Sequence, residues 1–63
     1  MFEVLALWFP DTAEEYLELL AVAANDLEAG EIARESARLL QHQPCRVYVH
    51  SVAVEGYFSD HDL

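Results

Sequence analysis

The fold is decided by residues 10–25, PDTAEEYLELLAVAAN, which follow the apolar segment FEVLALWF at residues 2–9. The leading segment is short and rich in aromatic and apolar residues, and a proline ends it. These features are typical of a β-strand. The chain is therefore predicted to begin with a strand, and the conformation of the next stretch sets the architecture.

Two overlapping helix-start signals open that stretch. Asp11 and Thr12 are each followed three residues later by a glutamate, which is the spacing of a helix capping box. At 100° per residue the acids gather on one face and the apolar residues on the other. The apolar face comprises Ala13, Tyr16, Leu17, Leu20, Ala24 and Leu27. We therefore predict a helix that runs to about Asn25.

A second helix is predicted after a turn, with Asp26 and Gly30 as its two possible starts. It should end near residues 41–43, because Pro44 follows. Its inward stripe consists mainly of small residues, which allow close packing against another element. The stripe comprises Ala29, Ile32, Ala33, Ser36, Ala37 and Leu40.

Residues 45–58 are rich in valine and tyrosine and predict β-structure. As one strand they would extend about 47 Å at ~3.4 Å per residue, too long for so small a domain. Either one strand bends near His50 or two strands are joined by a turn at Gly56, and the sequence leaves both open. Residues 59–63 are predicted to form a mobile acidic tail.

The predicted fold class is α+β, in the order strand-helix-helix-strand(s), with two helices packed on one face of a small antiparallel sheet. All of residues 1–63 should form a single domain, because so short a chain cannot assemble two cores. The helices can cover only one face of the sheet. The other face, with Leu5, Leu7 and Phe9 from the first strand, needs a partner.

Length and charge narrow the function. The 63 residues include 12 acids and 3 bases, a net charge of −9. Such a charge disfavours direct binding to nucleic acid or to an anionic membrane. The chain is also short for a catalytic cleft, so we expect no enzyme. We see no signal peptide and no apolar run of the ~18 residues that span a bilayer, and the single Cys45 indicates the cytoplasm.

The candidate reactive groups do not form a recognisable site. His42 and Cys45, with His50 and the segment Asp60–Asp62, lack the four closely spaced ligands of a structural zinc site. His50 and Ser51 point to opposite faces of a regular strand and cannot form a nucleophile–base pair. We therefore expect no metal and no cofactor.

Most aromatic residues are predicted to belong to the core. The aromatic residues in question are Trp8, Phe9, Tyr48, Tyr57 and Phe58. Tyr48, which shares a strand face with Arg46 and His50, is the best candidate for an exposed contact.

The acids allow two interpretations. In the first, they simply solvate a helix face; in the second, they bind a basic surface. On a helix, Asp11, Glu14 and Glu18 would extend over about 10.5 Å, close to a row of phosphates spaced ~3.4 Å apart. The predicted partner-binding residues are Asp11, Glu14, Glu15, Glu18, Asp26, Glu28, Asp60 and Asp62.

In size, acidity and overall profile, these residues make the chain resemble the small inhibitors that phages use against host defences, namely anti-CRISPR and other DNA-mimic proteins. The resemblance carries no specific motif. It implies a stoichiometric inhibitor, in the host-cell cytoplasm, that blocks the nucleic-acid path of a basic partner such as a CRISPR effector. The alternative is a small homodimeric interaction or accessory module whose uncovered apolar sheet face is the site.

Overall fold

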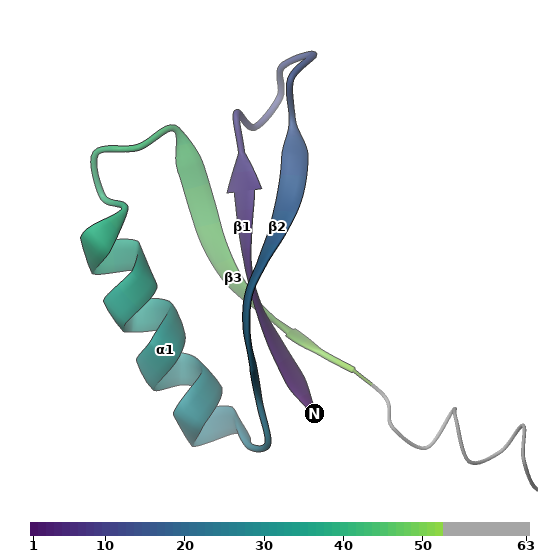
Figure 1. The fold of residues 1–63 in the computed structure, drawn as a ribbon, viewed down its shortest axis with the longest axis vertical. Helices are drawn as coiled ribbons and strands as arrows, with labels where there is room; N and C mark the ends of the chain where they lie inside the picture. Colours follow the sequence, from purple (N-terminus) through teal and green to yellow (C-terminus); the bar gives the residue numbers. More distant parts are fainter. Residues whose placement is uncertain (53–63) are drawn as a thin grey trace, which may run out of the picture.

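The structure, a computed structural model, describes residues 1–52. It contains three strands and one helix in the order β1 (Phe2–Trp8), β2 (Tyr16–Ala23), α1 (Asp26–Leu39) and β3 (Cys45–Ser51). β1 lies in the centre of the sheet and pairs antiparallel with both of its neighbours. The helix lies along one face of the twisted sheet (Figure 1).

The predicted first helix is wrong, because residues 16–23 form strand β2. The architecture is still α+β, but one helix rather than two covers the sheet. A central strand that is apolar on both faces needs a hydrogen-bonded neighbour along each edge. β2 supplies one of them, from Phe2 opposite Ala23 to Trp8 opposite Tyr16. This pairing overrides the helix propensity of a segment rich in leucine, alanine and glutamate.

The predicted helix-start residues build the loop between β1 and β2 instead. The Thr12 hydroxyl accepts a hydrogen bond from the Glu14 N–H at 3.2 Å and donates one to the Phe9 carbonyl at 2.6 Å. The Glu15 carboxylate accepts from the Asp11 N–H at 2.8 Å. Phe9 and Asp11 have φ values of 51° and 65°, in the left-handed region that reverses the chain direction. The same capping side chains therefore close a hairpin loop.

A β-bulge in β2 sets which side chains face the helix. The register between β1 and β2 shifts after Val4, so that Leu20 is the extra residue. Leu17 and Leu19 lie on the face away from α1 before the bulge, and Val22 lies on that same face after it. Leu20 is half-buried against the core.

The second predicted helix is confirmed, beginning at Asp26, the first of its two predicted starts. Asn25 is its N-cap, and the Asn25 side chain accepts a hydrogen bond from the Glu28 N–H at 2.8 Å. α1 ends at Leu39, slightly earlier than predicted. Of its predicted inward stripe, Ala29 is fully buried, whereas Ala37 is exposed.

The core between α1 and the sheet is small. Val4 is the only large side chain among the described residues that is fully buried, and the other buried residues are alanines. Half-buried side chains surround them, namely Phe2, Leu20, Ala21, Ile32, Ala33 and Val47. β3 ends at Ser51, and residues 53–58 of the predicted continuation lie outside the described residues, as does the predicted tail at 59–63.

Candidate functional site

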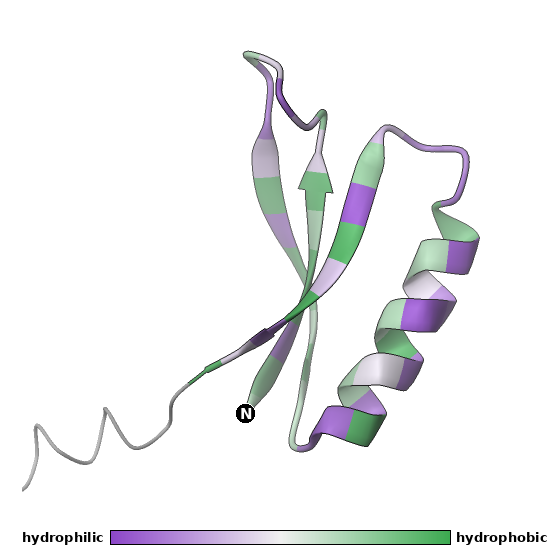
Figure 2. Ribbon diagram, turned by 180° about the vertical axis from the view of Figure 1, so that it is seen from behind, coloured by the Kyte–Doolittle hydropathy of each residue, from purple (hydrophilic) through white to green (hydrophobic). Residues whose placement is uncertain are grey.

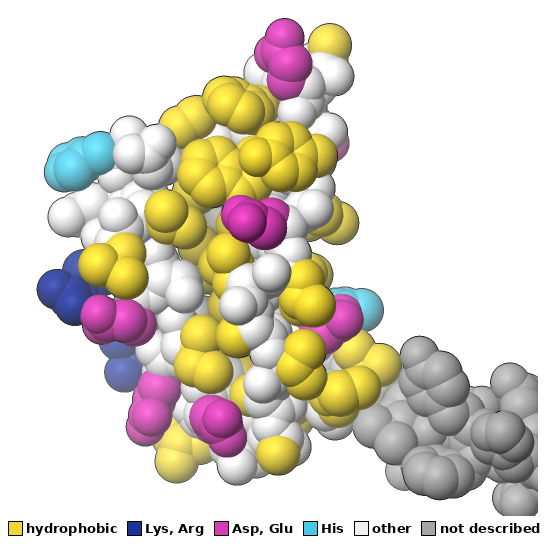
Figure 3. All heavy atoms as spheres, in the orientation of Figure 1, with side chains coloured by type: hydrophobic (Ala, Val, Ile, Leu, Met, Phe, Trp, Pro, Cys, Tyr) yellow, Lys and Arg dark blue, Asp and Glu magenta, His cyan; other side chains and the backbone are white. Residues whose placement is uncertain are grey.

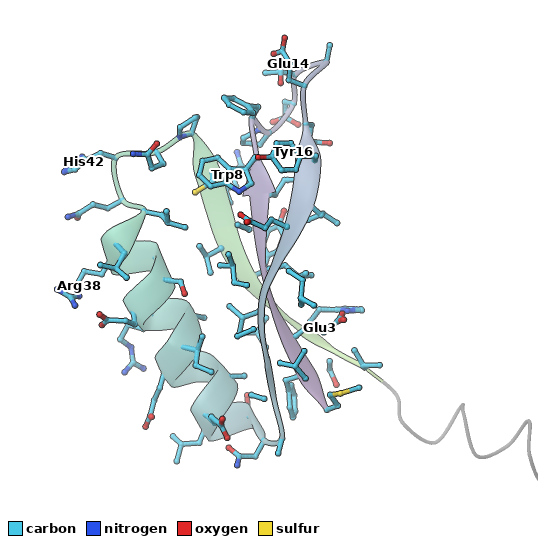
Figure 4. The ribbon with its side chains drawn as sticks, viewed as in Figure 1. Glu3, Trp8, Glu14, Tyr16, Arg38 and His42 are labelled. Carbon is cyan, nitrogen blue, oxygen red and sulfur yellow. The ribbon has the colours of Figure 1, made fainter. Side chains whose placement is uncertain are left out.

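The predicted acidic ridge is not a single surface. Asp11, Glu14 and Glu15 lie in the loop between β1 and β2, and Glu14 is at one end of the molecule in Figure 4. Asp26 and Glu28 lie in the first turn of α1, beyond the other end of β2 (Figure 1). The acids therefore form two groups separated by the length of a strand. Because residues 16–23 are not helical, the predicted match between helix rise and phosphate spacing is wrong.

Several of these acids have local structural roles. Glu15 closes the hairpin loop, and the Glu18 carboxylate accepts a hydrogen bond from the Trp8 indole N–H at 2.8 Å. Asp26 and Glu28 lie where the positive end of the helix dipole favours negative charge. Asp60 and Asp62 lie outside the described residues.

The sheet face away from α1, here called the open face, is mostly apolar. Side chains of paired residues share a face, and successive residues alternate between faces. The open face therefore comprises Glu3, Leu5 and Leu7 from β1, Leu17, Leu19 and Val22 from β2, and Arg46, Tyr48 and His50 from β3. Figure 2, which views the sheet from behind, shows hydrophobic residues along most of β1. Leu5 and Leu7 thus lie on a face that no helix or strand of residues 1–52 covers, as predicted.

The open face exposes large side chains that a monomer normally buries. Leu17, Leu19, Val22 and Tyr48 retain 59%, 53%, 50% and 40% of their accessible surface. Contiguous apolar patches of this kind mark interaction sites. Tyr48 lies there between the two basic residues of its strand, as predicted.

The few charged side chains of the open face lie at its two ends. Among the described acids, only Glu3 belongs to this face, and its carboxylate lies 3.2 Å from the His50 ring nitrogen Nδ1. Arg46 lies at the other end of the face, in register with Leu7. The open face is therefore close to neutral in a chain whose net charge is −9.

A second exposed cluster, here called the aromatic platform, consists of Trp8, Tyr16 and Phe9. The Trp8 and Tyr16 rings are nearly parallel, inclined by 15° with centroids 6.4 Å apart. Phe9 is tilted against both rings. Figure 4 shows Trp8 and Tyr16 next to each other, and Figure 3 shows hydrophobic side chains gathered at this end of the molecule.

The predicted position of Phe9 is wrong. Most of the aromatic residues were predicted to belong to the core, and Phe9 was placed with Leu5 and Leu7 on the uncovered face of the first strand. Instead, Phe9 follows β1 in the loop, and its positive φ turns it toward Trp8 and Tyr16. Tyr16 was missed, because its partnership with Trp8 requires the hairpin register.

The described residues offer no constellation of reactive groups. Across residues 1–52 no three His, Cys, Asp or Glu side chains are grouped so that they could hold a metal ion, and no pocket is present in that part of the chain. Cys45 is a half-buried free thiol at the start of β3. The Asp60-His61-Asp62 segment lies outside the described residues.

Comparison of the chain with protein-family models, with curated proteins and with solved structures found no match. In the described part of the chain, no helix is both long enough and apolar enough to cross a membrane.

Proposed function

We propose that this protein is a non-enzymatic interaction module that pairs with a second copy of itself through the open face. The observation that carries the proposal is the exposure of Leu17, Leu19, Val22 and Tyr48 on a face from which nearly all of the described acids are absent. A chain with so small a core gains stability by burying this surface.

The charges on the open face favour one arrangement of the two copies. Consider a two-fold axis that lies between the sheets and is perpendicular to the strands. This axis sets each residue of the middle row, Leu19, Leu5 and Tyr48, opposite the same residue of the other copy. It also reverses the strand direction, so that each end of the face meets the opposite end of the partner's face. Arg46 then faces His50 of the partner subunit, and it lies one strand spacing, ~4.8 Å, from the partner's Glu3, the carboxylate beside that His50. An axis parallel to the strands would instead oppose two Glu3 carboxylates, which repel.

The size of the face indicates a reversible dimer. Three strands at ~4.8 Å spacing and a seven-residue central strand at ~3.4 Å per residue give a flat area of about 340 Å² per copy. Two copies would bury roughly twice this area, and more where side chains stand out from the sheet. This total is smaller than the about 1,200–2,000 Å² that stable specific interfaces bury. We therefore expect a weak dimer with a dissociation constant in the micromolar range.

Charge reversal tests the arrangement. The Arg46→Glu variant should weaken dimerisation in sedimentation equilibrium, because it places two acids together at each end of the interface. Adding Glu3→Arg should restore dimerisation, since the double variant recreates the pair with opposite polarity. A wild-type chain that stays monomeric at millimolar concentration refutes the proposal, and a double variant no better than the single one refutes the arrangement.

The remaining functional predictions are untested by the fold. Inhibition of a nucleic-acid-binding complex in the manner of an anti-CRISPR protein stays a prediction, and its helical ridge is replaced by two separate groups of acids. We assign the protein to the cytoplasm, because a single cysteine leaves no internal disulfide to form.

A further inference from the structure

The face of the sheet that carries α1 has a second exposed surface, beyond the part that the helix covers. Trp8, Tyr16 and Glu18 share this face, because Trp8 pairs with Tyr16 and Ala6 pairs with Glu18. The helix packs against the other half of the strands, around Val4 and Ala23. We infer that the aromatic platform and the Glu18 carboxylate bind an arginine side chain of a basic partner protein.

The geometry suits a flat cation. A guanidinium stacks on aromatic ring faces through cation–π attraction. Tyr16 is 52% exposed and Phe9 38% exposed, so the platform is accessible. Its rings are also held in place, because Trp8 stacks beside Tyr16 across the strands and is hydrogen-bonded to Glu18. A partner would therefore find the platform already ordered.

The Glu18 carboxylate supplies the matching charge. One oxygen, Oε1, accepts the Trp8 indole N–H at 2.8 Å, which holds the carboxylate at the edge of the platform. A carboxylate can accept several hydrogen bonds, and no hydrogen bond within residues 1–52 uses the second oxygen, Oε2. A guanidinium stacked on the rings would have N–H groups directed outward in its own plane, toward such an acceptor.

The surrounding charge favours a basic partner. Asp11, Glu14 and Glu15 lie in the loop that adjoins the platform. The three basic side chains other than histidine lie elsewhere: Arg34 and Arg38 on α1, and Arg46 on the open face. This end of the sheet is therefore strongly negative on the platform side, which would speed encounter with a basic surface.

Arginine is favoured over lysine for a physical reason. Lysine carries a compact, strongly hydrated charge, which can approach the carboxylate but gains less from stacking on a ring. Acids alone would attract both residues equally. Preference for arginine is thus the property that separates this site from a merely negative surface.

Because Trp8 is the only tryptophan of the chain, its signals report on the platform directly. The test is titration of the full-length protein with tetraarginine amide and, separately, tetralysine amide. The readouts are Trp8 fluorescence and the indole N–H resonance in a proton–nitrogen correlation spectrum. We expect tetraarginine to shift both signals saturably, with an affinity at least threefold higher than that of tetralysine.

Two variants with the same charge change provide the control. Glu18→Gln keeps a side-chain oxygen for the Trp8 indole and should lower tetraarginine affinity about threefold to tenfold. Glu28→Gln removes one charge from the first turn of α1, beyond the far end of β2, and should leave the affinity within twofold. Tyr16→Leu should lower it about threefold, and circular dichroism checks each fold.

The alternatives give different results. Equal affinity for both peptides, or equal loss in the two glutamine variants, shows general electrostatic attraction and overturns the inference. An unshifted indole resonance at saturating tetraarginine also overturns it. The inference is independent of dimerisation, because the platform and the open face lie on opposite sides of the sheet.

Discussion

Truncation of Leu19 is the sharpest test of the open face. Leu19 is 53% exposed in the single chain and lies in the middle row, which the proposed two-fold axis pairs with itself. Full burial of a leucine side chain is worth about 1.5–3 kcal/mol. Dimerisation would bury roughly the exposed half, or about 1 kcal/mol per copy.

Because the substitution is present in both copies, Leu19→Ala should weaken the dimer by about 2 kcal/mol. This corresponds to a rise of close to 30-fold in the dissociation constant. Sedimentation equilibrium across a wide concentration range measures that constant. The matched control is Leu27→Ala, since Leu27 is also an apolar residue, is 75% exposed and lies on α1.

The control should leave the dimer unchanged within about twofold, because Leu27 lies on α1, which packs on the opposite face of the sheet. Equal weakening by both variants would show that association depends on general hydrophobicity. An unchanged dissociation constant in Leu19→Ala would remove the open face as the contact. Denaturant unfolding at concentrations where the chain is monomeric separates effects on folding from effects on association.

Three further predictions concern the fold and are measured by urea unfolding. Val4→Ala should lower the free energy of unfolding by about 2–3 kcal/mol, because Val4 is the fully buried centre of a small core; a loss below 1 kcal/mol would contradict that role. Asn25→Ala should cost about 1 kcal/mol by removing the N-cap of α1, whereas Asn25→Asp should be nearly neutral. Asp11→Val should cost about 1–2 kcal/mol, since a β-branched residue at a φ of 65° is strained, and Asp11→Asn, which tolerates that conformation, should change little.

Short-range patterns in the sequence predicted the first strand and the α1 helix. The first strand was found from its apolar run and its closing proline. The helix from Asp26 was found from its stripe of small side chains, of which Ala29 is indeed fully buried, and from the proline that follows it, with its start left open between Asp26 and Gly30. The uncovered sheet face was also foreseen, because one layer of helix cannot cover both sides of an apolar strand.

Residues 16–23 show where such reasoning fails. Their leucines and alanines and the glutamate at position 18 favour a helix, and the capping motifs before them reinforced that interpretation. Those motifs satisfy backbone groups in a tight loop equally well, as the bond from the Asp11 N–H to Glu15 demonstrates. A capping residue shows that free backbone groups are satisfied, and it does not show which element follows.

The wrongly predicted first helix also misplaced the acids of the candidate site. A helix would have placed Asp11, Glu14 and Glu18 on one ridge, whereas the hairpin leaves the first two in a loop and puts Glu18 on a strand beside Trp8. The aromatic platform depends on the register that sets Trp8 opposite Tyr16. No spacing along the chain reveals that contact.

The sequence by itself determined the acidity, the first strand, the α1 helix and a surplus of apolar surface, because each follows from composition or from short-range periodicity. Only the tertiary structure decided that residues 16–23 pair as a strand, that the bulge at Leu20 returns Val22 to the open face, and that Trp8 meets Tyr16 and Glu18. The physical reason is that strand pairing satisfies the backbone groups of two distant segments together. The preference of either segment alone is too weak to decide the outcome.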